Sequence, residues 1–238
     1  MTARRFTEAQ MAGAFEKLLC NPAKHGYRYV FDLVYKEVPC WPGRPDFLGL
    51  KGGLPPHSRH PQLPLSLIAC SILSVLKPRA GRTERHIQLR LGTHSQAVRR
   101  VLSQLEASGF VARTGKTAYR LGPSAIFVNL KLTTFELKLS SPARAVYQAV
   151  RNKEFSDRSY IVVPPGMEPG YSNHLPSMNR WGIGLLTFDP HTAQLNTVLR
   201  SRVVSPPSRA QAIRSKSKIA HSALTSATQT AVLCLSKA

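Results

Sequence analysis

Three segments rich in glycine and proline divide this chain, and they constrain its fold more strongly than any other feature of the sequence. They are residues 49–64, 122–124 and 164–176. Neither a helix nor a central strand is expected to run through such a segment, because proline lacks the backbone N–H and glycine leaves the backbone loose. The predicted domains are an α/β domain made of 1–53 and 123–204, an inserted helical domain over 62–122, and a basic C-terminal helix or tail over 205–238.

Basic residues outnumber acidic ones and are concentrated in two parts of the chain. There are 33 Lys and Arg against 12 Asp and Glu, which gives a formal net charge of +21. Residues 51–120 hold 12 of the bases and only two of the acids, and seven bases but no acid follow Asp189. A concentrated excess indicates a surface that binds a polyanion, whereas an even excess would serve solubility.

The rest of the composition is that of an ordinary globular protein. Hydrophobic residues make up 42% of the chain, which argues against a disordered basic tail. No run of about 18 apolar residues exists, so we expect no membrane partner. The four cysteines form no CxxC pair, which favours reduced thiols in an intracellular protein over a zinc site or disulfides.

The basic middle segment is expected to contain three helices followed by a hairpin. Apolar residues at helical spacing predict helices over 64–76, 83–91 and 93–108. Thr83 or Arg82 opens the second helix, Gly92 forms the turn, and Thr93 is a candidate N-cap of the third. Two strand-like runs, 110–113 and 117–121, then predict a basic hairpin. This order of elements resembles winged helix-turn-helix domains of transcription regulators.

Polar residues in this segment are placed where such domains contact DNA. Those in the first half of the third helix would reach base edges and phosphates, and those on the hairpin would grip the backbone. The predicted DNA-binding residues are Thr93, His94, Ser95, Gln96, Arg99, Arg100, Arg113, Lys116 and Arg120. We expect duplex DNA as the partner and a cytoplasmic, nucleoid-associated location. The alternative is a three-helix bundle whose basic face is simply solvated.

The flanking parts predict an α/β arrangement around a mixed sheet. The expected helices are 6–19 and 142–155, and the expected strands are 27–38, 47–50, 125–139, 160–163, 182–188 and 197–204. Neither flank has enough elements to form a domain alone, so we expect the two to fold together.

Two short clusters in the flanks carry possible chemistry. They are Pro45-Asp46 and Glu136-Leu137-Lys138. Glu136 and Lys138 leave the same face of a strand because they are two residues apart. Two carboxylates can hold Mg²⁺, which polarises a phosphoryl oxygen and activates water, and a lysine can orient that water or stabilise the developing charge.

These clusters, in this order of elements, resemble the PD-(D/E)XK or restriction-endonuclease-like nuclease superfamily. The resemblance implies a mixed sheet flanked by helices and a catalytic set of Asp46, Glu136, Lys138 and the helical Gln148. It implies Mg (or Mn) as the cofactor, held by Asp46, Glu136 and a first-helix glutamate that Glu16 matches. The long separation between Asp46 and Lys138 departs from the family pattern, and an inserted winged helix would explain it.

Other functions remain open at this stage. The leading hypothesis is a metal-dependent DNA endonuclease, and the rival is a non-catalytic winged-helix regulator that uses a degenerate nuclease fold as a scaffold. An RNA-binding protein is a third class, although no RNP-type or KH-type motif supports it. Glu136 with Lys138, and Glu16 with Lys17 or Lys24, also have the simpler reading of surface ion pairs. A homodimer is left open.

Overall fold

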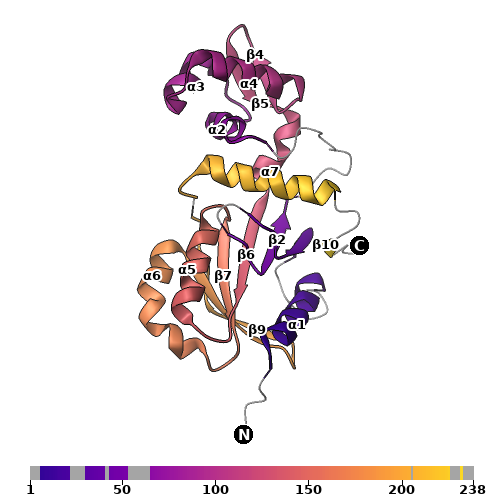
Figure 1. The fold of residues 1–238 in the computed structure, drawn as a ribbon, viewed down its shortest axis with the longest axis vertical. Helices are drawn as coiled ribbons and strands as arrows, with labels where there is room; N and C mark the ends of the chain where they lie inside the picture. The colour runs from indigo at the N-terminus through magenta and orange to yellow at the C-terminus, as the bar shows by residue number, and fades with distance from the viewer. Residues whose placement is uncertain are drawn as a thin grey trace. The chain divides into compact units, whose positions relative to one another are not determined.

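The computed structural model describes residues 6–21, 30–40, 43–52, 65–204, 206–225 and 231–232. The chain forms two compact units, and segments that are far apart in the sequence contribute to each of them (Figure 1). The first unit comprises Met1–Gly53, Lys131–Pro206 and Thr228–Ala238, and the second comprises Leu54–Leu130 and Pro207–Ala227.

A seven-stranded mixed sheet forms the centre of the first unit. Its strand order is β10-β1-β2-β6-β7-β8-β9, in which β6, β7 and β8 are parallel and the other neighbours are antiparallel. The strands are β1 (Leu33–Lys36), β2 (Phe47–Lys51), β6 (Lys131–Leu137), β7 (Arg158–Val163), β8 (Ile183–Asp189), β9 (Gln194–Leu199) and β10 (Ala231–Val232). The predicted α/β class, with a mixed sheet flanked by helices, is confirmed.

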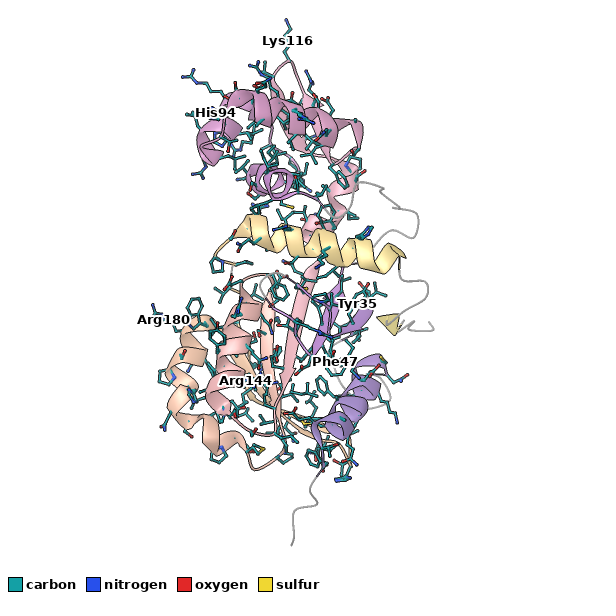
Figure 2. All side chains as sticks on the ribbon, viewed as in Figure 1. Tyr35, Phe47, His94, Lys116, Arg144 and Arg180 are labelled. Carbon is teal, nitrogen blue, oxygen red and sulfur yellow. The ribbon has the colours of Figure 1, made fainter. Side chains whose placement is uncertain are left out.

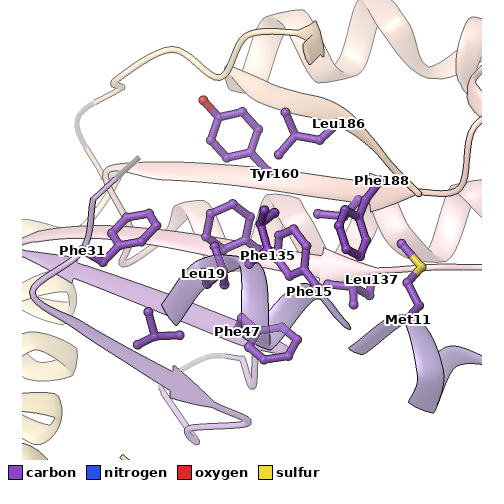
Figure 3. Packing of buried hydrophobic residues seen from close by; sticks show 13 residues of the cluster. Met11, Phe15, Leu19, Phe31, Phe47, Phe135, Leu137, Tyr160, Leu186 and Phe188 are labelled. Atoms are coloured by element: carbon purple, nitrogen blue, oxygen red, sulfur yellow. The ribbon is translucent and has the colours of Figure 1, made fainter. Parts of the chain in front are cut away.

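Helix α1 (Glu8–Cys20) covers one face of this sheet. Thr7 and Gln10 form a capping box that fixes where the helix begins. Phe15 then lies edge-on to three sheet phenylalanines, with ring centroids 5.2–5.6 Å apart (Figure 3). Such edge-to-face pairs are preferred by aromatic rings and add to the burial of their apolar area. The partners of Phe15 are Phe47, Phe135 and Phe188.

Helices α5 (Pro142–Lys153) and α6 (Leu175–Trp181) belong to the apolar cluster on the opposite face. Strand β7 shows the alternation directly, because Tyr160 and Val162 pack in the cluster with α1 whereas Ile161 and Val163 pack in the cluster with α5 and α6. Both faces of the central strands are therefore buried, as expected for parallel strands.

Two predictions for the flanks are wrong in part. The strand predicted over 125–139 begins only at Lys131, because Pro123 starts a 3₁₀ helix, η2 (Pro123–Asn129). The break predicted over 164–176 contains the 3₁₀ helix η3 (Glu168–His174) and the start of α6. Two of its prolines, Pro169 and Pro176, lie in the first turn of these helices, where the missing N–H costs nothing.

The remaining flank predictions hold with shifted ends. Strand β1 starts at Leu33 rather than at residue 27, and residues 22–29 lie outside the described part of the chain. Strand β9 covers Gln194–Leu199 rather than 197–204. The linker predicted over 49–64 lies outside the described residues from position 53 onward.

The second unit contains four α-helices and a three-stranded sheet of order β3-β5-β4 within its described residues. Its elements are α2 (Leu67–Val75), β3 (Arg82–Thr83), α3 (Glu84–Leu91), α4 (Ser95–Ala107), β4 (Val111–Thr114), β5 (Ala118–Leu121), η2 and α7 (Arg209–Thr225). Thr83 caps α3 by accepting a 3.2 Å hydrogen bond from the His86 N–H, and Gly92 ends α3 with a φ of 59°. The N-cap of α4 is His94 instead of Thr93, whose hydroxyl donates to the Leu91 carbonyl.

Helix α7 is part of the second unit, where it packs against α2 and η2. The Ser217 hydroxyl accepts a 3.3 Å hydrogen bond from the Leu65 N–H, and the Lys216 ammonium donates to the Val128 carbonyl at 3.4 Å. Residues 123–130 and most of 205–238 were expected elsewhere, and their apolar faces explain the difference because both bury side chains in this core. None of the described helices is long and apolar enough to span a membrane.

Candidate functional site

Asp46 and Glu136 are brought together by the pairing of β2 with β6. The two strands are antiparallel with Phe47 opposite Phe135, so the residue before β2 lies beside the end of β6. The Asp46 Oδ2 accepts a 2.7 Å hydrogen bond from the Leu137 N–H. Lys138 Nζ lies 3.7 Å from Asp46 Oδ2 and 3.7 Å from Glu136 Oε2. The three residues predicted as the core of the site are therefore adjacent.

Glu136 is a buried carboxylate with an incomplete set of partners. It is 1% exposed, and its Oε1 accepts a 2.7 Å hydrogen bond from Asn152 Nδ2 on α5. Its Oε2 accepts no hydrogen bond from any described residue. Burial, followed by the charge of Asp46, raises the pKa of Glu136 to about 7, although Asn152 and Lys138 act in the opposite direction.

The pKa of the Asp46 carboxyl is also raised. Burial is the largest cause that raises the pKa of its carboxyl, and the negative charges of Glu8 and Glu37 raise it further. The Leu137 N–H and the Lys138 ammonium lower it. Two adjacent carboxylates with raised pKa values need positive charge, and one lysine shared between them supplies only part of it.

Glu16 does not belong to this cluster. Its carboxylate lies 3.6 Å from the Lys36 ammonium, and it is two turns along α1 from Glu8, about 12 Å at 1.5 Å per residue. Glu8 is the α1 carboxylate that lines a pocket of 230 Å³ together with Asp46. The capping box at Thr7 fixes Glu8 in the first turn of the helix, and the packing of α1 on the sheet brings that turn to Asp46.

Gln148 lies on the other side of Glu136, in a pocket of 330 Å³ that both residues line. The Gln148 Oε1 is buried and has no hydrogen-bond donor among the described residues. This pocket is also lined by three arginines that were not among the predicted site residues: Arg44, Arg144 and Arg151. Figure 2 labels Arg144 on α5. The pocket therefore combines cationic groups with unsatisfied acceptors.

Gly43 allows the chain to approach α5 closely at this pocket. A Cβ atom at position 43 would lie 2.7 Å from the Asn152 Oδ1, which is closer than real Cβ contacts occur. Asn152 in turn donates a hydrogen bond to the Glu136 carboxylate, so Gly43 affects the position of that carboxylate through Asn152. The backbone at Gly43 can lie this close to Asn152 because glycine has no side chain.

The donor set fits a divalent metal of the Mg²⁺ type. Asp46 and Glu136 offer hard oxygen ligands, and the unsatisfied Glu136 Oε2 is the atom that such an ion would satisfy. No three His, Cys, Asp or Glu side chains in the described ranges gather closely enough to hold a metal ion by themselves. Mg²⁺ is commonly held by one or two carboxylates, with water and phosphate as the other ligands, so two carboxylates suffice.

The residues predicted to bind DNA lie on α4 and the β4–β5 hairpin of the second unit. All are exposed except the half-buried Thr93: His94, Ser95, Gln96, Arg99, Arg100, Arg113, Lys116 and Arg120. Figure 2 labels His94 at the start of α4 and Lys116 on the turn of the hairpin. The exposed polar and basic side chains therefore come from consecutive elements of the second unit, α4 and the β4–β5 hairpin.

Two of these arginines already have carboxylate partners. Arg99 Nε lies 2.5 Å from Glu84 Oε1, and Arg113 makes two hydrogen bonds of 3.1 Å to Glu106. Both acids of the basic segment are used in this way. For Arg100, Lys116 and Arg120, no carboxylate partner is present within the described residues, so their charges are available to a polyanion.

Sequence comparison does not assign this arrangement. No protein-family model matches the chain, and no curated protein resembles it significantly.

Proposed function

We propose that this protein is a metal-dependent DNA nuclease that binds duplex DNA through its second unit and cleaves phosphodiester bonds in its first. One observation carries the proposal: Lys138 Nζ lies 3.7 Å from each of two carboxylates, that of the buried Glu136 and that of the half-buried Asp46. A structural ion pair needs only one acid. Two acids with raised pKa values around one lysine are typical of a functional site.

The topology supports this proposal. Glu136 is on the central strand β6, Asp46 precedes its antiparallel neighbour β2, and Gln148 is on the crossover helix α5 to the parallel strand β7. This is the arrangement implied by the resemblance to restriction-endonuclease-like enzymes. The order α2-β3-α3-α4-β4-β5 of the second unit likewise supports the proposal, because it is the order expected of a winged helix-turn-helix.

Asp46 and Glu136 would hold the Mg²⁺ or Mn²⁺ ion. When bound, the ion supplies positive charge to the phosphoryl oxygen and lowers the pKa of a water molecule. Lys138 is close enough to both acids to hold the attacking water in place and to stabilise charge that develops on the phosphate. Asn152 fixes the Glu136 carboxylate, and the arginines of the α5 pocket would bind the negatively charged strand.

The second unit would supply most of the affinity for DNA. Helix α4 presents its exposed polar face as a recognition helix does in the major groove, and Lys116 on the hairpin would contact the phosphate backbone. A nuclease of this kind would act on DNA in the cytoplasm at the nucleoid. Its affinity should fall steeply as salt is raised.

Plasmid cleavage tests the proposal. Supercoiled plasmid is incubated with Mg²⁺ and either the unmodified protein, Asp46→Ala or Lys138→Ala. We expect nicking by the unmodified protein and its loss in both variants, while gel-shift affinity for duplex DNA in EDTA stays the same. Equal nicking by all three proteins would sink the assignment of this site.

The second candidate is a regulator that binds DNA without cleaving it. It is favoured by the Lys138 ion pairs, which already compensate part of the charge that a metal would neutralise. Calorimetric titration with Mg²⁺ and Mn²⁺ separates the two candidates. A millimolar or tighter metal site that is lost in Asp46→Ala supports the nuclease, and its absence supports the regulator.

A further inference from the structure

Tyr147 occupies an unusual position in the first unit. Its side chain is 61% exposed, yet it lines the same 330 Å³ pocket as Glu136 and Gln148. It belongs to neither of the apolar clusters of the sheet, so the fold does not use its ring for core packing. An exposed aromatic ring at the edge of a charged pocket is suited to stacking on a ligand.

The surroundings of this ring come from one face of α5. Arg144, Tyr147, Gln148 and Arg151 follow the spacing of three and four residues that puts side chains side by side on a helix. The Arg151 guanidinium carbon lies 5.8 Å from the centroid of the Tyr147 ring, above its plane. One side of the ring is thus covered by a cation, and its high exposure leaves other ring surface accessible.

The polar groups of the pocket are those that a nucleotide would satisfy. The Gln148 Oε1 is buried without a donor among the described residues, and every nucleobase carries N–H donors on its edge. Neither Arg144 nor Arg151 has a carboxylate partner in the part of the chain that the structure describes, so both are available for phosphate. The volume of 330 Å³ is at the lower end of the range of about 300–1,000 Å³ typical of ligand pockets.

From this arrangement we infer that the α5 pocket binds one unpaired nucleotide of a DNA strand beside the carboxylate pair. The base stacks on Tyr147, an N–H of its edge donates to Gln148, and the adjoining phosphate lies on Arg144 or Arg151. Within a duplex both faces of each internal base are covered by its neighbours, so a base must be unpaired to stack on the ring and also present its hydrogen-bonding edge to Gln148. The preferred substrates are therefore duplexes with a single-stranded tail, flap or junction, and this conclusion rests on the proposed action on DNA.

The test measures binding without cleavage. Fluorescence anisotropy in EDTA compares three labelled DNAs: a blunt duplex, the same duplex with a short unpaired tail, and that duplex with an abasic tail that keeps every phosphate. Stacking on Tyr147 should make the tailed duplex bind about 5- to 150-fold more tightly than the blunt one. The abasic tail should lose most of that preference.

Three variants assign the effect to the ring. Tyr147→Ala should abolish the preference for the tail while leaving blunt-duplex affinity unchanged, and Tyr147→Phe should retain it. Trp181→Ala is the matched control, because Trp181 is an exposed aromatic residue of α6 that does not line this pocket. A 2-aminopurine base at the first tail position should be quenched by the unmodified protein and not by Tyr147→Ala.

The outcomes also separate this inference from the proposed nuclease activity. Equal binding of base-containing and abasic tails overturns it, since phosphate contacts alone would then explain the tail effect. A tail preference that survives Tyr147→Ala also overturns it. Mg²⁺-dependent cleavage without any tail preference contradicts the inference and leaves the nuclease proposal standing. A Tyr147-dependent preference without cleavage supports the inference and contradicts the nuclease proposal. If the protein binds none of these DNAs, both proposals are overturned.

Discussion

Replacing Glu136 by glutamine should stabilise the first unit at alkaline pH. The carboxyl has an ordinary pKa of 4.5, and burial beside Asp46 raises it to about 7. Between these two pH values the folded state binds more protons than the unfolded state, so the stability of the protein falls as pH rises through this window. Glutamine stays neutral at every pH, and its side-chain oxygen can still accept the hydrogen bond from Asn152.

The size of the effect follows from the same two values. A difference of 2.5 pH units corresponds to about 3 kcal/mol at pH 8 and above, and it vanishes near pH 4. The opposing attraction of Lys138 is already part of the raised pKa, so it needs no separate correction. We therefore expect Glu136→Gln to raise the free energy of unfolding by up to about 3 kcal/mol at pH 8 and to leave it unchanged at acidic pH.

Urea unfolding at several pH values in EDTA measures this directly. Tryptophan fluorescence reports on the first unit, because Trp41 and Trp181 are both outside the residue ranges of the second. Asp157→Asn is a suitable control, since Asp157 pairs with Lys131 at the opposite end of β6 from Glu136, and asparagine can still accept the hydrogen bond from the Leu132 N–H. The reasoning is refuted if Glu136→Gln is less stable than the unmodified protein at pH 8, or if the difference between them does not change with pH.

Three further predictions follow from the site and the basic surface. Saturating Mg²⁺ should raise the unfolding midpoint at pH 8 by an amount equivalent to about 2.7 kcal/mol at 100 times the dissociation constant, and Asp46→Asn should show no such increase in a thermal-shift assay. Gly43→Ala should push the Asn152 amide away and lower the cleavage rate with little change in DNA affinity, which a comparison of nicking and gel-shift assays would show; unchanged nicking would contradict this role of Gly43. Lys116→Ala and Arg100→Ala should each make the slope of log affinity against log salt shallower by about 0.9, as expected for the loss of one phosphate contact; an unchanged slope would mean that the residue does not touch the backbone.

The strand that carries Glu136 was predictable because its signals are local. A period of two places Glu136 and Lys138 on one face, and Asp46 directly precedes a short apolar run that reads as the neighbouring strand. Once β2 pairs with β6 in the register that sets Phe47 opposite Phe135, Asp46 lies beside Glu136. The caps at Thr83 and Gly92 were equally local, and α3 between them and α4 after them lie within a few residues of their predicted ends.

The parts that could not be predicted depend on contacts between distant segments. Which α1 carboxylate lies near the site depends on how the helix packs, and this selects Glu8 over Glu16. The α5 pocket forms only when the loop at Gly43 meets the helix that carries Arg144, about 100 residues later. The prolines of 164–176 were read as a break, although a first-turn proline is compatible with a helix.

The position of α7 in the second unit has a consequence for the synthesis of the protein. Helix α2 packs against α7, yet about 130 residues separate the two along the chain. A ribosome that adds about 5–20 residues per second needs roughly 7–30 s to make that interval. During this time α7 is not yet present to cover its contact surface on α2. Strand β1 lacks its neighbour β10 for still longer, because more of the chain separates these two strands. The second unit is thus completed only after α7 has been made and the sheet of the first only after β10, so a nascent chain that stops before residue 209 would contain neither unit in finished form.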